Sequence, residues 1–484
     1  MSLTQMCDRE RGWCEVPEVR TWQLAAGAAV VGLALAAGAV AAAGPWDSGQ
    51  RKAEREWAAA QSPSGGAHHQ VPGPKRPAPA PSAPGVLTAL GAPATAPAPA
   101  PASASVPGDL AEVLAPLLGD PGLGPVRTAS VVEVATGRRL YEHGAADPMT
   151  PASTIKIATS AAALSALGPD HRIPTTVVVS KDGEELTLVG GGDPTLGRAA
   201  LGTLADRTVR ALRDRGTGTV RLTYDTSLYS GTSRHPIGPN GNLAPVSALM
   251  VGQGRINQTA TGYATRTGDP AGDAARTFER LLSERGVDTS ATPSPGRPAA
   301  GSKPLAKVLS APLSALVEQA LTNSDNDIAE ALARQTALAT GEEASFRGAE
   351  RAVTKQLAKL KLPLTGARFA DGSGLNRADK LSAGLLTALL ALAADPAHPE
   401  LRPVLTGLPV AGFSGTLHGR YGGTSPGTGL VRAKTGTLTG VNALAGTVVA
   451  PDGRLLAFAF LAGNTPSATA AEPALDRLAA ALAS

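Results

Sequence analysis

The stretch TPASTIKIAT, residues 150–159, places a serine and a lysine three positions apart at the start of a helical run. Pro151 lies just ahead of the run, small and apolar residues fill it, and Gly168 can stop it, so we predict a helix here. Residues three apart on a helix share a face. The spacing therefore predicts that Ser153 Oγ and Lys156 Nζ lie within hydrogen-bond reach.

This pairing suggests an activated hydroxyl, because a serine is a weak nucleophile until a neighbouring base takes its proton. Lysine is such a base only when neutral. Lowering its pKa from ~10.4 toward 7 takes on the order of 4–5 kcal/mol, which burial and a second cation can supply. The first helical turn adds a helpful positive potential. The alternative is a surface lysine beside a serine. Of the eleven lysines, only Lys156 has a serine three residues earlier, which favours the pair.

A second motif, Ser324-Asp325-Asn326, lies within TNSDNDIAEAL at a break between two helical stretches. In a loop, Ser324 can relay protons, and the amide of Asn326 offers both a donor and an acceptor. The alternative is a helix cap, because all three residue types favour that position.

A third motif, Lys434-Thr435-Gly436-Thr437, lies on a predicted strand that leads into an antiparallel hairpin over 441–463. A glycine in a strand allows close approach of a ligand to the backbone. Lys434 could be the second cation near the catalytic pair, and the threonines could hold a carboxylate. The alternative is an edge strand that a lysine protects from pairing.

S-x-x-K, S-D-N and K-T-G, in this order, are the signature of serine β-lactamases and penicillin-binding proteins. The sequence resembles the low-molecular-mass penicillin-binding proteins that act as D-alanyl-D-alanine carboxypeptidase/endopeptidase. Further stretches carry the resemblance, namely LGPDHRIPTTVV, LVGGGDPTL, DGSGLNR and GFSGTLHGRY. It extends from Asp109 to the C-terminus and covers nothing before that residue.

The resemblance implies an α/β (α+β) fold, with a transpeptidase domain like that of penicillin-binding proteins and serine β-lactamases, interrupted by an inserted α+β domain. The texture of the sequence changes at about Ile173, where a hairpin pattern follows the helical run. We therefore expect the catalytic domain at 107–172 and 305–484, and the inserted domain at 173–304.

The resemblance also implies catalytic roles. Ser153 would attack the carbonyl between two D-alanines of a peptidoglycan stem peptide and form an acyl-enzyme. Lys156 would be the base, Ser324 would pass a proton to the leaving group, and Asn326 would hold the substrate amide.

The substrate-binding residues follow from the third motif. The resemblance implies that its members shape the site and receive the terminal carboxylate; they are Lys434, Thr435, Gly436 and Thr437. Backbone N–H groups of Ser153 and Thr437 would form the oxyanion hole, and the peptide would lie along this strand. β-Lactam antibiotics would acylate Ser153 and remain attached.

Two other functions stay open. A β-lactamase needs a glutamate that promotes deacylation, and none is evident in a suitable loop. A non-catalytic penicillin-binding sensor or scaffold could retain the same side chains. Asp371–Leu375, DGSGL, is interpreted as a structural turn, since Asp371 replaces the first glycine of a G-x-S-x-G nucleophile motif.

Several other classes are disfavoured. No Gly-Lys pair exists, so no phosphate-binding loop can be drawn. The seven histidines show no H-E-x-x-H spacing, and we expect neither a metal nor a cofactor. The 44 Lys and Arg residues are scattered against 40 Asp and Glu, and aromatic residues make up 3% of the chain, so a nucleic-acid partner is not expected.

The N-terminal region predicts attachment to the cell membrane. Leu24–Ala43 carries no charge over twenty residues, enough helix to cross a hydrocarbon core of about 30 Å. We expect a cytoplasmic tail at 1–23, a single transmembrane helix at 24–43, and a disordered Pro/Ala-rich linker at 44–106. The catalytic part would lie outside the cytoplasm, or be secreted if the chain is cleaved near Ala43.

Overall fold

The computed structural model of this protein describes residues 110–216, 218–256 and 261–484. The expected tail at 1–23, helix at 24–43 and linker at 44–106 lie outside this range, so their predictions stand untested. In the described part of the chain, no helix combines the length and the apolar character needed to cross a membrane.

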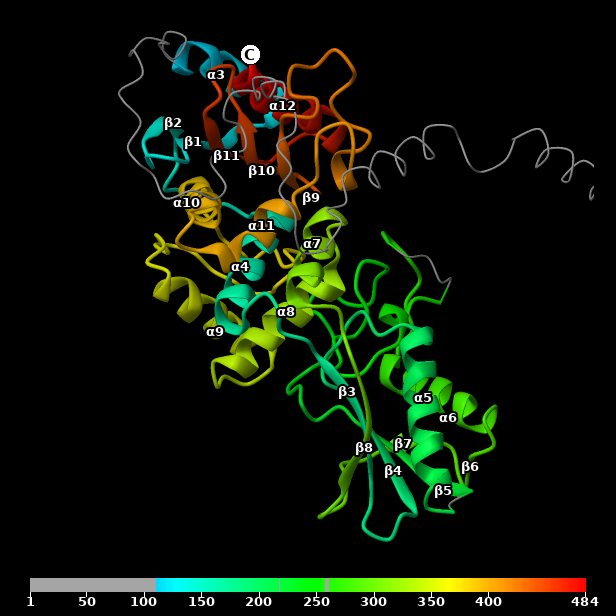
Figure 1. Ribbon diagram of the computed structural model, residues 1–484. Helices are drawn as coiled ribbons and strands as arrows, with labels where there is room; N and C mark the ends of the chain where they lie inside the picture. Colours follow the sequence, from blue (N-terminus) through cyan, green and yellow to red (C-terminus); the bar gives the residue numbers. More distant parts are fainter. Residues whose placement is uncertain (1–109, 217, 257–260) are drawn as a thin grey trace, which may run out of the picture. The chain divides into compact units, whose positions relative to one another are not determined.

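The first element of the architecture is a five-stranded antiparallel sheet (Figure 1). Its strand order is β2-β1-β11-β10-β9, so both ends of the described chain contribute to it. The hairpin predicted over 441–463 is confirmed. The strands are β1 (Val126–Glu133), β2 (Arg139–His143), β9 (Arg432–Leu438), β10 (Val441–Val449) and β11 (Leu455–Gly463).

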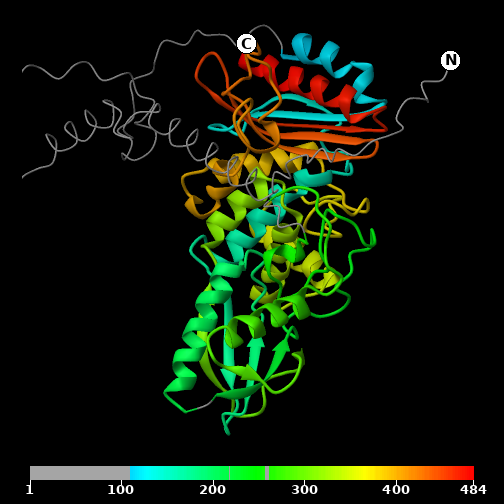
Figure 2. The ribbon, with the colours of Figure 1, turned by 90° about the vertical axis from the view of Figure 1, so that its right-hand side faces the viewer.

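Helices cover both faces of this sheet (Figure 2). α3 (Leu110–Leu118) and α12 (Ala468–Ala480) pack on one face, and α10 (Ala383–Ala394) packs on the other. Strand β11 alternates accordingly: Phe458 and Phe460 face α12, while the alanines next to them face the α10 side. This period of two is expected for a strand buried on both faces.

Beyond α10, a group of four helices surrounds α4 (Ile155–Leu167), the helix that the opening stretch of sequence predicts. Ten consecutive residues of α4, from Ile155 to Leu164, are buried. This explains its small and apolar composition, because a helix enclosed on all sides has no polar face. The helices around it are α7 (Leu313–Thr322), α8 (Asn326–Ala339), α9 (Phe346–Lys359) and the short α11 (Pro403–Thr406).

A second, mixed sheet with its own hydrophobic core lies in the region where an inserted domain is expected. Its last strand, β8, runs to Leu309 and so passes the expected boundary at residue 304. The strands are β3 (Pro174–Val179), β4 (Glu185–Val189), β5 (Thr219–Asp225), β6 (Asp288–Thr289), β7 (Ser294–Pro295) and β8 (Lys303–Leu309), covered by α5 (Arg198–Arg213) and α6 (Pro270–Ser283).

The segment from 226 to 269, which joins β5 to α6, connects this second sheet to α8. Its Ala244 N–H donates to Asp327 Oδ1 at 3.0 Å, and Arg266 forms a buried ion pair with the same carboxylate at 2.8 Å. Asp327 belongs to the first turn of α8, so this segment is anchored beside the second motif.

Candidate active site

The predicted Ser153–Lys156 pair is formed. Ser153 lies in a short 3-10 turn, Ala152–Thr154, that leads directly into α4, and Lys156 lies in the first turn of that helix. Lys156 Nζ donates to Ser153 Oγ at 2.9 Å, to Asn326 Oδ1 at 2.7 Å and to the Ser373 carbonyl at 2.6 Å. The lysine is fully buried, so three protein acceptors take the place of water around its amine.

The electrostatic surroundings of Lys156 oppose one another. Burial lowers the pKa of the amine to about 8, although nearby carboxylates, of which Asp371 and Asp325 have the largest effects, favour the charged form. Near pH 7 roughly a tenth of the molecules would therefore carry a neutral Lys156. A second cation, which the sequence analysis considered, is not required to lower the pKa of Lys156, because desolvation is the principal cause.

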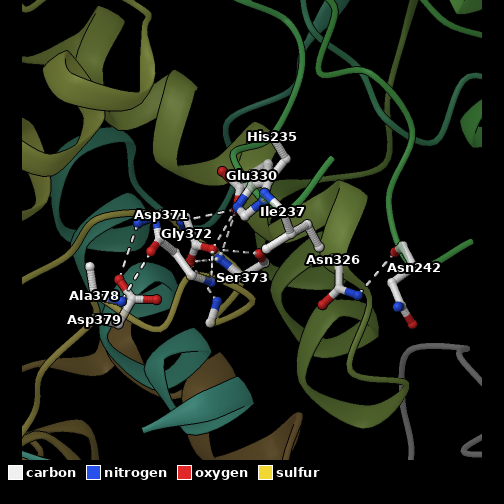
Figure 3. A network of polar contacts seen from close by, with 12 residues as sticks. His235, Ile237, Asn242, Asn326, Glu330, Asp371, Gly372, Ser373, Ala378 and Asp379 are labelled. Carbon is white, nitrogen blue, oxygen red and sulfur yellow. Dashed lines mark hydrogen bonds and ion pairs between the residues drawn. The ribbon is translucent and has the colours of Figure 1, made fainter. Parts of the chain in front are cut away.

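The neighbouring residues of the second motif make different contacts. Asp325 caps α8, since its carboxylate accepts from the N–H of Ile328 at 2.9 Å. Asn326, the first helical residue, is thus free to contact Lys156 through its oxygen. Its nitrogen donates to the Asn242 carbonyl at 3.0 Å (Figure 3). Ser324 has a left-handed backbone, φ 55°, and its hydroxyl makes no hydrogen bond within the described residues.

The third motif lies on β9, the edge strand of the first sheet. Lys434 is fully buried and donates to the Thr435 carbonyl at 2.9 Å, so it does not protect the strand edge. Burial, together with the charges of Lys156 and Arg420, lowers the pKa of Lys434 well below its usual range. This amine therefore loses its proton much more readily than a surface lysine does.

Gly436 allows β9 to lie against the turn that carries the serine. A Cβ at this position would sit 2.6 Å from the Pro151 carbonyl oxygen and 3.2 Å from Ala152 Cβ. Ala152 itself has a left-handed backbone, φ 46°. The glycine was expected to admit a ligand; in the structure it admits the neighbouring backbone.

The two threonines of this motif differ in exposure. Thr435 is buried and donates to the Thr416 hydroxyl at 2.8 Å, whereas Thr437 is exposed. Thr437 Oγ1 donates to Glu472 Oε1 on α12 at 3.2 Å. Nothing in the local sequence pattern of α12 indicates this glutamate.

The Asp371–Leu375 segment is a structural turn, as predicted, and it also contributes to the site. The Asp371 carboxylate accepts from the N–H groups of Ser373 at 3.0 Å and Gly374 at 2.6 Å. Glu330 accepts from the N–H groups of Gly372 at 3.1 Å and Ser373 at 3.0 Å (Figure 3). These bonds aim the Ser373 carbonyl at Lys156, a contact that sequence reasoning missed. The DGSGL stretch was its only signal.

The one group of side chains in the described residues that could hold a metal ion is His235, Glu330 and Asp371, whose potential ligand atoms lie within 4.8 Å of one another. Backbone N–H groups already occupy the Glu330 and Asp371 carboxylates, and His235 binds Asp371 directly. The ammonium group of Lys156 lies against the same turn. We therefore interpret the group as a hydrogen-bond network.

Comparisons with known proteins agree with this geometry. The model of the "D-Ala-D-Ala carboxypeptidase 3 (S13) family" matches residues 110–265 and 257–482. A carboxypeptidase DacB of Mycolicibacterium smegmatis is 39% identical over 78% of this chain and 84% of its own length. A D-alanyl-D-alanine carboxypeptidase of an Actinomadura species is 30% identical over 72% of this chain and 80% of its own length.

Among solved structures, penicillin-binding protein 4 of Haemophilus influenzae has a similar fold. The TM-score is 0.64 at 23% identity, covering 75% of this chain and 97% of that protein. The same protein has also been solved in complex with a β-lactam, and this second structure superposes with a TM-score of 0.62. This likeness establishes the mixed α/β fold expected for penicillin-binding proteins.

Proposed function

Because this chain belongs to the D-Ala-D-Ala carboxypeptidase 3 (S13) family, we propose that Ser153 is its nucleophile and Lys156 its general base. The protein is a serine-type D-Ala-D-Ala carboxypeptidase. One observation supports the residue assignment above the others. The fully buried Lys156 amine, with a pKa of about 8, lies 2.9 Å from the Ser153 hydroxyl.

The first step is acylation. Neutral Lys156 accepts the proton of the Ser153 hydroxyl while its oxygen attacks the carbonyl between the two D-alanines. The C–N bond then breaks, the terminal D-alanine leaves with a proton passed on by Ser324, and an ester joins the peptide to Ser153. A water molecule hydrolyses this ester in the second step and regenerates the hydroxyl.

Substrate recognition is assigned to β9 and Asn326. The backbone N–H groups of Ser153 and Thr437 would stabilise the negative oxygen of the tetrahedral intermediate. The Asn326 amide would hold the peptide, and the hydroxyls of Thr435 and Thr437 would receive the terminal carboxylate. The same acyl-enzyme can form from a cross-linked peptide, so endopeptidase action on peptidoglycan belongs to this proposal.

A rapid β-lactamase is less consistent with the site. Its deacylation requires a carboxylate that activates water next to the ester. The buried Glu330 is near Lys156, but one of its oxygens accepts from two backbone N–H groups, of Gly372 and Ser373. We therefore expect β-lactams to leave a long-lived adduct on Ser153.

The cellular location and domain limits are also proposals. The uncharged run at 24–43 supports a single-pass membrane anchor, with the catalytic domain outside the cytoplasm where peptidoglycan lies. The second sheet and its separate core support an inserted domain within 173–309.

The nucleophile can be tested by intact mass spectrometry after incubation with benzylpenicillin. We expect one stable adduct on the wild type and none on Ser153→Ala, because among the described residues Ser153 Oγ is the only hydroxyl oxygen bonded to the Lys156 amine. Ser290→Ala, which removes an exposed hydroxyl of the second sheet region, is the matched control and should be labelled fully. An adduct on Ser153→Ala would show that another residue is the nucleophile.

A parallel assay separates an enzyme from a sensor. A peptide ending in D-Ala-D-Ala is incubated with each variant, and free D-alanine is measured. The wild type and Ser290→Ala should release D-alanine, and Ser153→Ala should not. A wild type that takes up benzylpenicillin but releases no D-alanine would be a non-catalytic penicillin binder.

A further inference from the structure

The segment between β5 and α6 brings a histidine into the catalytic network. His235 is buried, and its Nε2 lies 2.8 Å from Asp371 Oδ2 (Figure 3). Its Nδ1 lies 3.2 Å from the backbone nitrogen of Ile237, which can only donate. Nδ1 must therefore be the acceptor, and the proton of a neutral ring is on Nε2, where it is donated to Asp371.

This arrangement excludes His235 as a general base. One ring nitrogen accepts from the backbone and the other donates to a carboxylate, so neither is available to a substrate. The ring also packs edge-on against Phe346, with centroids 5.4 Å apart. Any effect of the imidazole on the reaction must therefore act through Asp371.

Asp371 links His235 to the backbone of the turn. The carboxylate oxygen that faces His235 also accepts from the Asn376 N–H at 2.7 Å, and the other oxygen accepts from Ser373 and Gly374. The Ser373 hydroxyl donates to the same carboxylate at 3.3 Å, and five donors on one buried carboxylate leave it little freedom to rotate. The position of the carboxylate thus sets the direction of the Ser373 carbonyl.

We propose that His235 is a positioning residue for acylation: it fixes the Asp371 turn, whose Ser373 carbonyl holds the Lys156 amine against Ser153. The contacts run without a gap, from Nε2 to the carboxylate, through the turn, and from the Ser373 carbonyl to Nζ at 2.6 Å. The inference rests on the proposed function of the catalytic pair. It gives the inserted region a role in the chemistry.

Other charged groups face this network and limit what a pH effect can mean. On α8 these are Glu330 and the fully buried Arg334, whose guanidinium stacks 4.2 Å from the Phe346 ring. Just beyond the turn lies Asp379. Burial and the neighbouring Asp371 raise the pKa of Asp379 to about 10. An informative test must therefore change the donor of His235 without adding or removing charge.

Two amides provide that test in the full chain. His235→Gln places an amide nitrogen near the position of Nε2 and can still donate to Asp371. His235→Asn is one methylene shorter; it can accept from Ile237 but cannot reach Asp371. His143→Asn, at an exposed position on β2, is the control. The second-order rate constant for acylation by a fluorescent penicillin is measured from pH 6 to 10, together with kcat, KM and the melting temperature.

We expect His235→Asn to lower the acylation rate constant by about a hundredfold, as a small displacement of a catalytic group does. For the peptide, kcat should fall while KM changes little. The apparent pKa of its rate profile should rise above the wild-type value, because a released Lys156 is hydrated. His235→Gln and His143→Asn should follow the wild type.

Two results would overturn the positioning role in folded protein: His235→Asn acylating like the wild type, or His235→Gln as impaired as His235→Asn. If His235→Asn melts below the assay temperature, the comparison of His235→Gln with the wild type decides alone. For His235→Gln, an acylation rate constant within about threefold of wild type, with the wild-type pH profile, supports the role. A larger loss contradicts it. A wild type that takes no label would instead overturn the proposed function.

Discussion

Two buried lysines in one site differ because their neighbours differ. Lys156 has three oxygen acceptors and carboxylates nearby, which keep its pKa near 8 despite complete burial. Lys434 has one carbonyl acceptor and experiences the charges of Lys156 and Arg420. A base works best with a pKa close to the working pH. The carboxylates around Lys156 therefore retain its basicity, while burial makes its neutral form accessible.

The titration of Lys156 predicts the pH dependence of acylation. Its folded pKa is lowered, so the reactive neutral form increases as the pH rises and is dominant above about 8. We expect the rate constant for acylation by a penicillin to rise about tenfold per pH unit below this value and to level off above it. Stopped-flow measurements from pH 6 to 10 provide the profile.

A flat pH profile would contradict this prediction. A rate constant that stays flat between pH 6 and 9 would mean that no proton acceptor titrates in this range, which contradicts the assignment of this role to a Lys156 amine with a pKa of about 8. Circular dichroism at each pH serves as the control, since it reports whether the fold itself changes.

At the level of elements, the site is formed where an edge strand meets a turn. β9 is paired on one side with β10 and lies against the Ala152–Thr154 turn. Gly436 is the point of closest approach, because any side chain there would meet the Pro151 carbonyl oxygen at 2.6 Å. Such a contact is shorter than van der Waals distance and must move one of the two backbones.

Gly436→Ala should therefore impair catalysis more than stability. Displacing β9 from the serine turn by a few tenths of an ångström would misplace the nucleophile and reduce acylation by about a hundredfold. Overpacking of this kind costs about 1–3 kcal/mol in the free energy of unfolding. Acylation kinetics and urea unfolding measure the two effects.

A matched glycine provides the control for this prediction. An added Cβ at Gly423 would meet no atom within 4 Å, and its backbone is not left-handed. Gly423→Ala should leave both acylation and stability unchanged. If Gly436→Ala behaves in the same way, β9 does not need its close approach to the turn.

At the level of the whole molecule, the segment from 226 to 269 fastens the second sheet to α8. Besides Asn242, which accepts from Asn326, three of its residues contact the first turn and cap of that helix: Gln253 donates to Asp325 at 2.7 Å, and Ala244 and Arg266 bind Asp327. The Arg266–Asp327 pair is buried, with side-chain exposures of 3% and 1%. Breaking such a pair leaves an uncompensated buried charge.

Arg266→Met should lower the free energy of unfolding by about 3 kcal/mol at pH 7.5, because the buried Asp327 carboxylate would lose its cationic partner. Burial already raises the pKa of Asp327 to about 6. At pH 5 the unpaired carboxyl would be protonated, so the difference from wild type should become smaller. Urea unfolding at both pH values tests the size and the direction of the effect.

Arg221→Met is the comparison, since the Arg221 side chain is 64% exposed in its ion pair with Glu185. Exposed pairs contribute about 0–1 kcal/mol, so this variant should lose little stability at either pH. A loss for Arg266→Met no larger than for Arg221→Met would mean that the segment is not fastened through Asp327.

Much of the local structure followed from short sequence patterns. The hairpin over 441–463 consists of two apolar runs separated by the turn Pro451-Asp452-Gly453, and it is present. The helix after Pro151 ends at Gly168, as its composition predicts. The pairing of Ser153 with Lys156 follows from helical spacing alone, because three positions along a helix place two side chains on one face.

The surroundings of that pair depend on contacts between segments far apart in the chain. Nothing near Ser373 indicates that its carbonyl receives the Lys156 amine, nor does the sequence around His235 indicate Asp371 as its partner. Spacing and composition act over a few residues, so they determine which groups share a helix face. Only the packing of the two sheets and their helices decides which groups lose water, and the loss of water is what changes the basicity of Lys156.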